Sequence, residues 1–284
     1  MISRRALLKG VAAIGAAGTG TCLYTWLVEP HWLEVVRRPL SIVGLPADLE
    51  GATLVQISDV HAGPSVADGY VEETFAQVRA LDPDLVVYTG DFASYHPEIF
   101  EQMERVYADP PRGRLGTVGI LGNHDYGPNW AHPEIAARLA GLLQARGIRV
   151  LRNEVADFAG LQIIGLDDLW AGRFDAEQGM ALRDPARPAV VLTHNPDTVD
   201  RAGWGNFAGW ILAGHTHGGQ CKPPFLAPPL LPVENRRYTS GPFDLSGGRT
   251  LYVSRGVGHL LQVRFNVRPE VTVFDLQPAS PVPG

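Results

Sequence analysis

The sequence predicts an α/β fold: a single domain in which helices cover sheets that contain parallel strands. From residue 53 onward, apolar runs of strand length alternate with helical segments, as in successive βαβ units. The chain has 284 residues, of which 45% are hydrophobic and 19% charged, so it can bury a sizeable core. No composition break or internal repeat divides it, which favours one domain over two.

The first half of the chain carries the βαβ pattern. Its apolar runs are short and are bounded by turn-forming residues, as in strands buried inside a sheet. The predicted strands are residues 53–58, 84–88 and 116–121. The predicted helices between and after them are residues 71–81, 97–107 and 133–146.

The second half consists of short strands separated by turns, and helical periodicity becomes scarce. The predicted strands are residues 149–151, 161–164, 189–193, 210–213, 250–254 and 270–274. The Pro-rich residues 222–232 begin shortly after the last histidine cluster, so we expect them to border a cleft. Their apolar side chains would suit either a rim for a lipid or membrane surface, or a rigid loop packed on the domain.

Residues 1–30 resemble a twin-arginine export signal. Arg4 and Arg5 precede nineteen uncharged residues, 10–28, that are rich in Gly and Ala. The resemblance implies the twin-arginine translocase as a partner and a location in the periplasm or cell envelope. No small-x-small cleavage site follows, and Tyr24 and Trp26 stand where interfacial aromatic residues would lie. Removal of the segment and its retention as a membrane anchor both remain open.

Charge and cysteine content exclude several classes of function. The net charge is −6, and the first thirty residues contribute +2, which leaves −8 on the rest. Such an acidic body does not attract polyanions, so we expect no nucleic-acid partner. With only Cys22 and Cys221, neither a disulfide framework nor a thiolate zinc site is possible.

Polar clusters directly follow five predicted strands. They are Asp59-Val-His61, Gly90-Asp91, Gly122-Asn123-His124-Asp125, Thr193-His194-Asn195 and Gly214-His215-Thr216-His217. In an open α/β sheet, ligands bind beyond the carboxyl ends of the strands, so these clusters should converge. Asp59 and Asp91, and again Asp91 and Asn123, are 32 residues apart, about one βαβ unit.

The residue types in these clusters indicate a metal site. Carboxylate, imidazole and carboxamide groups without thiolates suit Mn, Fe, Zn or Co. Seven candidates exceed the needs of one ion and suit two divalent ions that share Asp91. The candidate ligands are Asp59, His61, Asp91, Asn123, His194, His215 and His217. His31, His96, His132 and His259 match no motif, and we expect them to be packing or surface residues.

The order and spacing of DxH, GD, GNHD, H and GHxH resemble the calcineurin-like metallophosphoesterase superfamily over about residues 51–276. This resemblance implies a β-sandwich flanked by helices, in four layers α/β/β/α, as one domain over residues 31–284. The GHTHGGQ string that ends at Gln220 and the YVSRG segment at residues 252–256 are most similar to the YkuE-type branch, whose members are phosphodiesterase-like.

The resemblance also implies residue roles. One ion would be held by Asp59, His61, Asp91 and His217, and the other by Asp91, Asn123, His194 and His215. His124 would act on the leaving-group oxygen or the developing charge, and Asp125 would orient the ring of His124. Ser94 occupies the position at which purple acid phosphatases carry an iron-binding tyrosine, which argues against a ferric tyrosinate centre.

The implied function is that of a dinuclear phosphohydrolase at the cell envelope, in which a metal-bound hydroxide attacks phosphorus. We favour a phosphodiesterase, because two divalent ions, two carboxylates and a hydroxide leave about one positive charge for a singly charged diester to neutralise. The substrate is a phosphoester, with lipid-linked and wall-linked compounds as the candidates. The alternatives are a phosphomonoesterase or pyrophosphatase acting on a nucleotide-linked lipid, and a non-catalytic, metal-stabilised binding domain.

Overall fold

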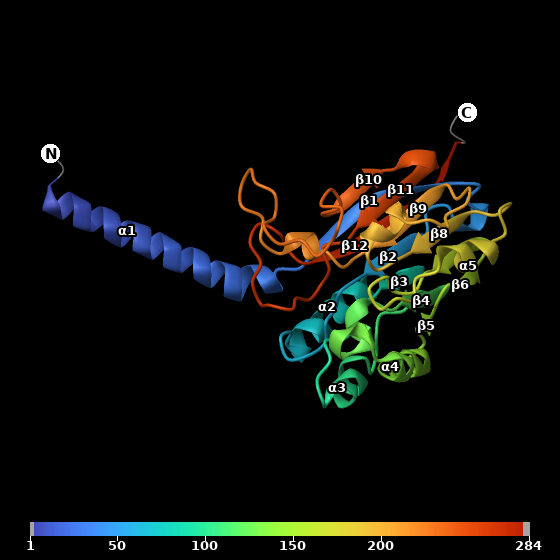
Figure 1. Cartoon of the computed structure of the whole chain (residues 1–284), viewed down its shortest axis with the longest axis horizontal. Helices are drawn as coiled ribbons and strands as arrows, with labels where there is room; N and C mark the ends of the chain where they lie inside the picture. The colour runs from blue at the N-terminus through green and yellow to red at the C-terminus, as the bar shows by residue number, and fades with distance from the viewer. Residues whose placement is uncertain (1–2, 281–284) are drawn as a thin grey trace.

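Two six-stranded sheets lie face to face, with helices on the outside, in the computed structural model, which describes residues 3–280 (Figure 1). The strand orders are β1-β12-β2-β3-β4-β5 and β10-β11-β9-β8-β7-β6. The predicted fold class, an α/β sandwich flanked by helices, is confirmed. The predicted segments 1–30 and 31–284 include residues 1–2 and 281–284, which lie outside the described residues.

The first sheet contains the strands of the predicted βαβ units. Its strands are β1 (Glu34–Val43), β2 (Thr53–Ile57), β3 (Leu85–Thr89), β4 (Gly116–Ile120), β5 (Arg149–Val150) and β12 (Glu270–Ala279). The helices on its outer face are α2 (Asp68–Ala80), α3 (Ile99–Val106) and α4 (Pro133–Ala145). Because β2, β3 and β4 are parallel, their carboxyl ends meet at one edge.

The second sheet is built from the short strands of the other half of the chain. Its strands are β6 (Glu154–Phe158), β7 (Leu161–Gly165), β8 (Ala189–Leu192), β9 (Gly209–Ala213), β10 (Gly241–Asp244) and β11 (Arg249–Val253). Strands β7, β8 and β9 are parallel, so their carboxyl ends also share one edge. The outer face of this sheet is covered by the short helix α5 (Ala176–Ala181) and by irregular segments.

Burial on both faces explains why the central strands are almost purely apolar. All five residues of β3 are buried: Leu85 and Val87 face the second sheet, whereas Val86 and Tyr88 face the helices. The layer between the sheets is closed by large side chains such as Phe274, whose ring lies 5.1 Å from that of Tyr252. Burial of this apolar surface stabilises the pairing of the two sheets.

Strand β1 is the largest element that the sequence did not predict. It pairs in parallel with β12 at the edge of the first sheet, with Glu34 opposite Glu270. Arg37, Arg38 and Pro39 interrupt its apolar pattern, and proline is tolerated in a strand when the strand lies at an edge. Strands β6 and β10 and helix α5 were also not predicted, because each is short and partly exposed.

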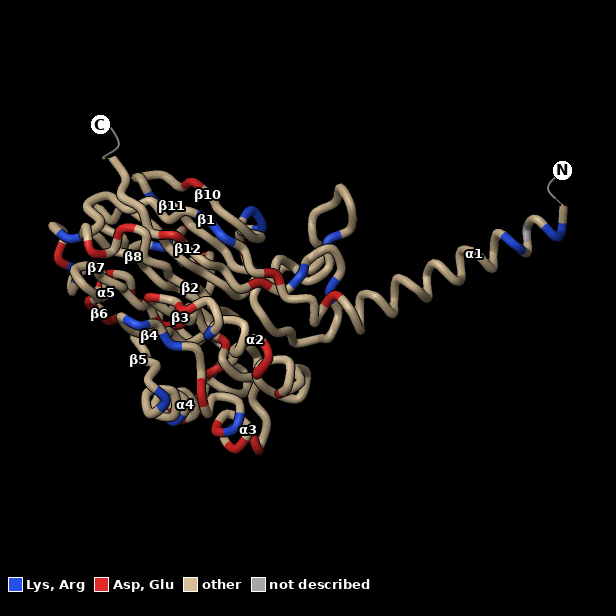
Figure 2. Tube along the Cα trace, turned by 180° about the vertical axis from the view of Figure 1, so that it is seen from behind, with Lys and Arg blue, Asp and Glu red and all other residues tan. Residues whose placement is uncertain are grey.

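The N-terminal segment is helical and projects away from the body (Figure 1). Helix α1 (Arg4–Leu23) continues through a π-helical turn (Tyr24–Val28) and a 3₁₀ turn (Glu29–His31). This stretch is long and apolar enough to cross a membrane. Figure 2 shows that its basic residues lie near the end remote from the body.

Candidate metal centre

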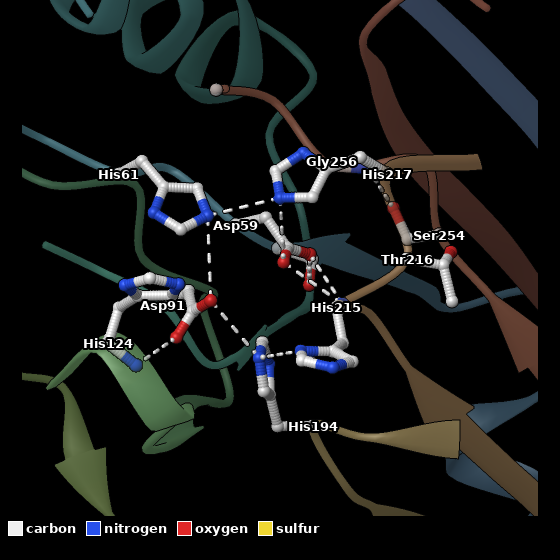
Figure 3. A network of polar contacts seen from close by, with 12 residues as sticks. Asp59, His61, Asp91, His124, His194, His215, Thr216, His217, Ser254 and Gly256 are labelled. Carbon is white, nitrogen blue, oxygen red and sulfur yellow. Dashed lines mark hydrogen bonds and ion pairs between the residues drawn. The ribbon is translucent and has the colours of Figure 1, made fainter. Parts of the chain in front are cut away.

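The structure brings all seven predicted ligands together where the carboxyl ends of both sheets meet. Figure 3 labels all of them except Asn123. Loops after β2, β3 and β4 in one sheet and after β8 and β9 in the other supply them. No member of the set is more than 6% exposed, although every one is polar. The set consists of Asp59, His61, Asp91, Asn123, His194, His215 and His217.

Two groups of side chains have the spacing of metal ligands. In the first group, Asp59, His61 and His217 converge, and the Nε2 atoms of the two histidines are 3.1 Å apart. In the second group, Asp91, His194 and His215 converge, and His194 Nε2 lies 3.1 Å from His215 Nδ1. Asn123 joins the second group, because its Oδ1 lies 3.2 Å from His194 Nε2.

Asp91 stands between the two groups. One of its oxygens, Oδ2, lies 3.5 Å from His61 Nε2 and 3.1 Å from His194 Nε2. A single carboxylate oxygen thus faces ring nitrogens of both groups. This is the position from which one carboxylate can bridge two ions.

The donor atoms fit divalent metal ions. His194 Nδ1 donates a hydrogen bond to the Thr89 carbonyl at 2.8 Å, which leaves Nε2 free to act as a ligand. His61 Nδ1 hydrogen bonds with the Ser94 hydroxyl at 3.0 Å, with the same effect. The Nε2 atoms of His61 and His217, 3.1 Å apart, are close enough to bind the same metal ion. The set of nitrogen and oxygen donors suits Mn, Fe, Zn or Co.

Burial lowers the pKa of His61 and the pKa of His215 to about 3, so both rings are neutral at physiological pH, which is the form that binds metal. His194 differs, because its burial is outweighed by Asp91 and Asp59, which raise its pKa to about 10. Burial alone would raise the pKa of Asp91, but the neighbouring imidazoles, above all that of His194, outweigh it and hold that pKa well below its usual value. The side chain of Asp91 is therefore ionised and can bind cations.

The backbone at the site is strained. Five of the candidate ligands have φ in the left-handed region, where residues other than glycine are uncommon. These residues are Asp59 (52°), His61 (50°), Asp91 (52°), His215 (71°) and His217 (50°). Such outliers cost of the order of 1–3 kcal/mol each and cluster at functional sites.

Two glycines allow the carboxylates to approach the neighbouring loops. A Cβ at Gly122 would meet Asp91 Oδ1 at 2.2 Å, and a Cβ at Gly214 would meet Asp59 Oδ2 at 2.3 Å. The approach gives each carboxylate a backbone donor: His124 N donates to Asp91 Oδ1 at 2.9 Å, and His215 N donates to Asp59 Oδ1 at 2.9 Å. The glycines of the GN and GH motifs are thus required by close packing against the carboxylates.

His124 differs from the seven ligand candidates because it is only half-buried. Its ring lies 5.1 Å from the ring of His61, measured between centroids. Asp125, which was predicted to orient this ring, forms its hydrogen bonds with backbone groups instead. Its Oδ1 accepts from Ala93 N at 3.1 Å and its Oδ2 from Gly122 N at 2.9 Å, and within residues 3–280 no hydrogen bond joins it to His124. The Asp125 carboxylate instead ties the turn that carries His124 to the segment after β3.

Two tryptophans at the site were not foreseen. The ring of Trp170 lies 4.4 Å from that of His215 and 4.7 Å from that of Trp130, which in turn approaches His124 at 6.5 Å. Trp130 has a φ of 58°, a strained conformation for so large a residue. Both side chains are half-buried and form an aromatic wall beside the histidines. Neither belongs to a periodic pattern or a metal motif, so no signal in a single sequence could have found them.

The chain belongs to the calcineurin-like phosphoesterase family, whose sequence model matches residues 52–219. It is 32% identical to the uncharacterized metallophosphoesterase YkuE of Bacillus subtilis, over 97% of this chain and 98% of the relative. It is 30% identical to the phosphodiesterase YaeI of Escherichia coli, over 97% of this chain and all of the relative. The UDP-2,3-diacylglucosamine pyrophosphatase LpxG of Chlamydia trachomatis is 26% identical, over 94% of this chain and 96% of the relative.

These likenesses confirm that the chain is a hydrolase of phosphoester bonds. Among its described residues are two groups of side chains that could each hold a metal ion.

Ser94→Ala tests whether the hydroxyl at this position supports a metal ligand. Without its hydrogen bond, the His61 ring loses its fixed orientation, and we expect metal affinity to fall about 10–100-fold. Competition with a chromophoric chelator measures the change. Ser41→Ala, on β1, is the matched control and should bind metal as the wild type does. Equal affinities of all three proteins would contradict the assignment.

Proposed function

We propose that the seven buried side chains hold two divalent metal ions and that the protein is a phosphodiesterase of the YkuE-type branch. The observation that carries this proposal is the position of Asp91, whose Oδ2 faces imidazoles of both groups at 3.5 and 3.1 Å. In the proposed arrangement Asp59, His61 and His217 would hold one ion, Asn123, His194 and His215 would hold the other, and Asp91 would be a ligand of both. The metals are drawn from Mn, Fe, Zn and Co.

Two bound ions supply the Lewis acidity that polarises a phosphoryl group and activates water. The ligand set carries only two carboxylates, Asp59 and Asp91, so a net positive charge remains to bind a phosphate anion. The neutral amide of Asn123 preserves this charge, which an aspartate at that position would reduce. The ring of His124, on the half-exposed side of the site, then lies within reach of the substrate.

His124 serves as the general acid in this proposal. In the hydrolysis, a water oxygen forms a bond to phosphorus and releases a proton to solvent, the bond from phosphorus to the leaving oxygen breaks, and His124 gives that oxygen a proton. Its backbone N–H, which donates to Asp91 Oδ1 at 2.9 Å, fixes the residue relative to the bridging carboxylate. Asp125 acts as a positioning residue, because it holds the same turn through two backbone N–H groups.

Two substrate chemistries have specific support. The similarity to a relative named phosphodiesterase, at 30% identity over nearly the whole chain, favours a diester. The similarity to a relative named UDP-2,3-diacylglucosamine pyrophosphatase, at 26% identity, favours a pyrophosphate bond on a nucleotide-linked lipid. Both bonds are phosphoric ester or anhydride linkages that the same arrangement of side chains could cleave.

His124→Ala tests the general acid. We expect hydrolysis of bis-p-nitrophenyl phosphate to fall about 10²–10⁴-fold while the metal content stays unchanged, since His124 is not a proposed ligand. Rates are measured with Mn²⁺ present, and metal content by elemental analysis. His132→Ala is the matched control, because His132 is an exposed histidine paired with Glu134. A rate equal to that of the wild type would remove His124 from the mechanism.

The same assay, repeated with p-nitrophenyl phosphate and with a UDP-linked pyrophosphate, separates the substrate chemistries. A higher kcat/KM on the diester supports the phosphodiesterase, whereas a higher value on the pyrophosphate establishes the second candidate.

We also propose that the twin-arginine translocase exports the folded protein and that α1 is retained as a membrane anchor. The Arg-Arg pair at residues 4–5 supports the first part. Replacing both arginines (Arg4→Lys with Arg5→Lys) should keep the protein in the cytoplasmic fraction of a host that has this translocase. The control is Arg37→Lys with Arg38→Lys, a second Arg-Arg pair, on β1. Undiminished export of the first variant would contradict the proposed route.

A further inference from the structure

Exposed apolar side chains gather on two loops at the base of α1. Phe225 is fully exposed, Leu230 is 77% exposed and Leu261 is 72% exposed. Figures 1 and 2, seen from opposite sides, both show these loops on the side of the body from which α1 extends. We call the following residues the apolar platform: Phe225, Leu226, Leu230, Leu260, Leu261 and Val263.

Hydrogen bonds join the two loops to each other. Lys222 N donates to the Phe265 carbonyl at 2.9 Å. The Gln220 side chain spans the base of the second loop, because its Nε2 donates to the carbonyls of Leu261 and Val263, both at 2.9 Å. The exposed tips are therefore held by an ordered base.

The same base holds the end of the N-terminal helix. Arg264 N donates to the Thr25 carbonyl at 3.0 Å, and Gln262 Nε2 donates to the Trp26 carbonyl at 3.0 Å. The chain then enters the body through Glu29, which is 1% exposed and accepts from Val267 N at 2.6 Å. The apolar platform and the helix are thus one structural unit with a fixed mutual orientation.

The chemistry of this unit fits a lipid bilayer. Helix α1 and the turn that follows it contain nineteen uncharged residues, 10–28, about 28 Å of helix, which matches the hydrocarbon core of a membrane. Its remote end carries Arg4, Arg5 and Lys9, whereas aromatic residues gather at the end near the body. There the Arg268 guanidinium lies 4.1 Å from the ring of Trp32, a pairing suited to the headgroup region.

We propose that the apolar platform inserts into the interface of the bilayer that α1 spans, and that the metal centre acts on phosphoesters of membrane lipids. A membrane normal along α1 places the bilayer surface near residues 24–28, where the platform is attached. Apolar loop tips at that depth bury their side chains among the headgroups and upper acyl chains. The second part of this proposal rests on the proposed phosphohydrolase function.

Both loops begin at the metal centre, which connects docking with substrate access. The first loop follows His217, a candidate ligand. The second follows Gly258, whose N–H donates to the Asp59 carbonyl at 2.7 Å. Arg264, at the end of the second loop and fully buried, donates through Nη2 to the carbonyl of Gly258 at 2.7 Å. The platform therefore holds the site close to the headgroups, where the phosphate of a lipid lies.

Depth measurements on the full chain test the docking. In a Cys22→Ser, Cys221→Ser background, single cysteines (Phe225→Cys or Leu261→Cys) are labelled with an environment-sensitive dye, and the protein is reconstituted in vesicles of phosphatidylethanolamine and phosphatidylglycerol. We expect both labels to be quenched by lipid-borne nitroxide and shielded from aqueous iodide. The matched control is Leu182→Cys, at an exposed position at the end of α5 and remote from α1. A label there should be quenched by aqueous iodide and not by lipid-borne nitroxide.

Iodide quenching at residues 225 and 261 equal to that at residue 182 would overturn the docking. If a protein partner covers the platform instead, the labels will also remain open to iodide in these vesicles, which contain no other protein.

A lipid substrate and a soluble substrate, assayed in parallel, test whether the apolar platform gives the metal centre access to membrane lipids. Phe225→Asp with Leu230→Asp should slow hydrolysis of a phospholipid with a fluorogenic coumarin headgroup, embedded in the same vesicles, by about tenfold or more. Hydrolysis of soluble bis-p-nitrophenyl phosphate should be unchanged, which shows that the fold and the site are intact. Equal rates of variant and wild type on the lipid would overturn the proposed access. If the wild type cleaves neither compound, the proposed phosphohydrolase function is contradicted. The docking of the apolar platform is then tested by the label measurements alone.

Discussion

The carboxylate of Asp91 is the contact on which the structure of the site depends. It is buried between two groups of imidazoles, with one oxygen 3.5 Å from His61 Nε2 and 3.1 Å from His194 Nε2. Burial keeps the rings of His61 and His215 neutral, and neutral ring nitrogens gathered around a buried carboxylate are the donors that metal cations bind. The fold holds this arrangement although it is costly without ions.

The rest of the molecule holds these donors in place. Parallel strands in each sheet deliver their polar loops to one edge, and the layer between the sheets brings the two edges together. Strained left-handed residues and tightly packed glycines then aim the carboxylates at the centre of the cluster. The loops are also anchored by apolar side chains of their own, since Val60, Phe92 and Leu121 are buried in the core beneath the helices.

Much of this arrangement could be predicted from the sequence, and the limits have physical causes. The central strands and the convergence of Asp59, Asp91 and His215 follow from apolar runs and from spacing, both of which are local signals. Strand β1 was missed because Pro39 and two arginines hide an edge strand whose pairing with β12 joins residues more than 200 positions apart. The wall of Trp130 and Trp170 and the actual partners of Asp125 depend on tertiary contacts between separate loops, which no periodicity reveals.

The number and position of bound ions test the central claim most directly. Crystals of the full chain grown with Mn²⁺, measured near the manganese absorption edge, should give two anomalous peaks on either side of the Asp91 carboxylate, one beside His61 and His217 and the other beside His194 and His215. A map with one peak, or with none among these side chains, would contradict the account.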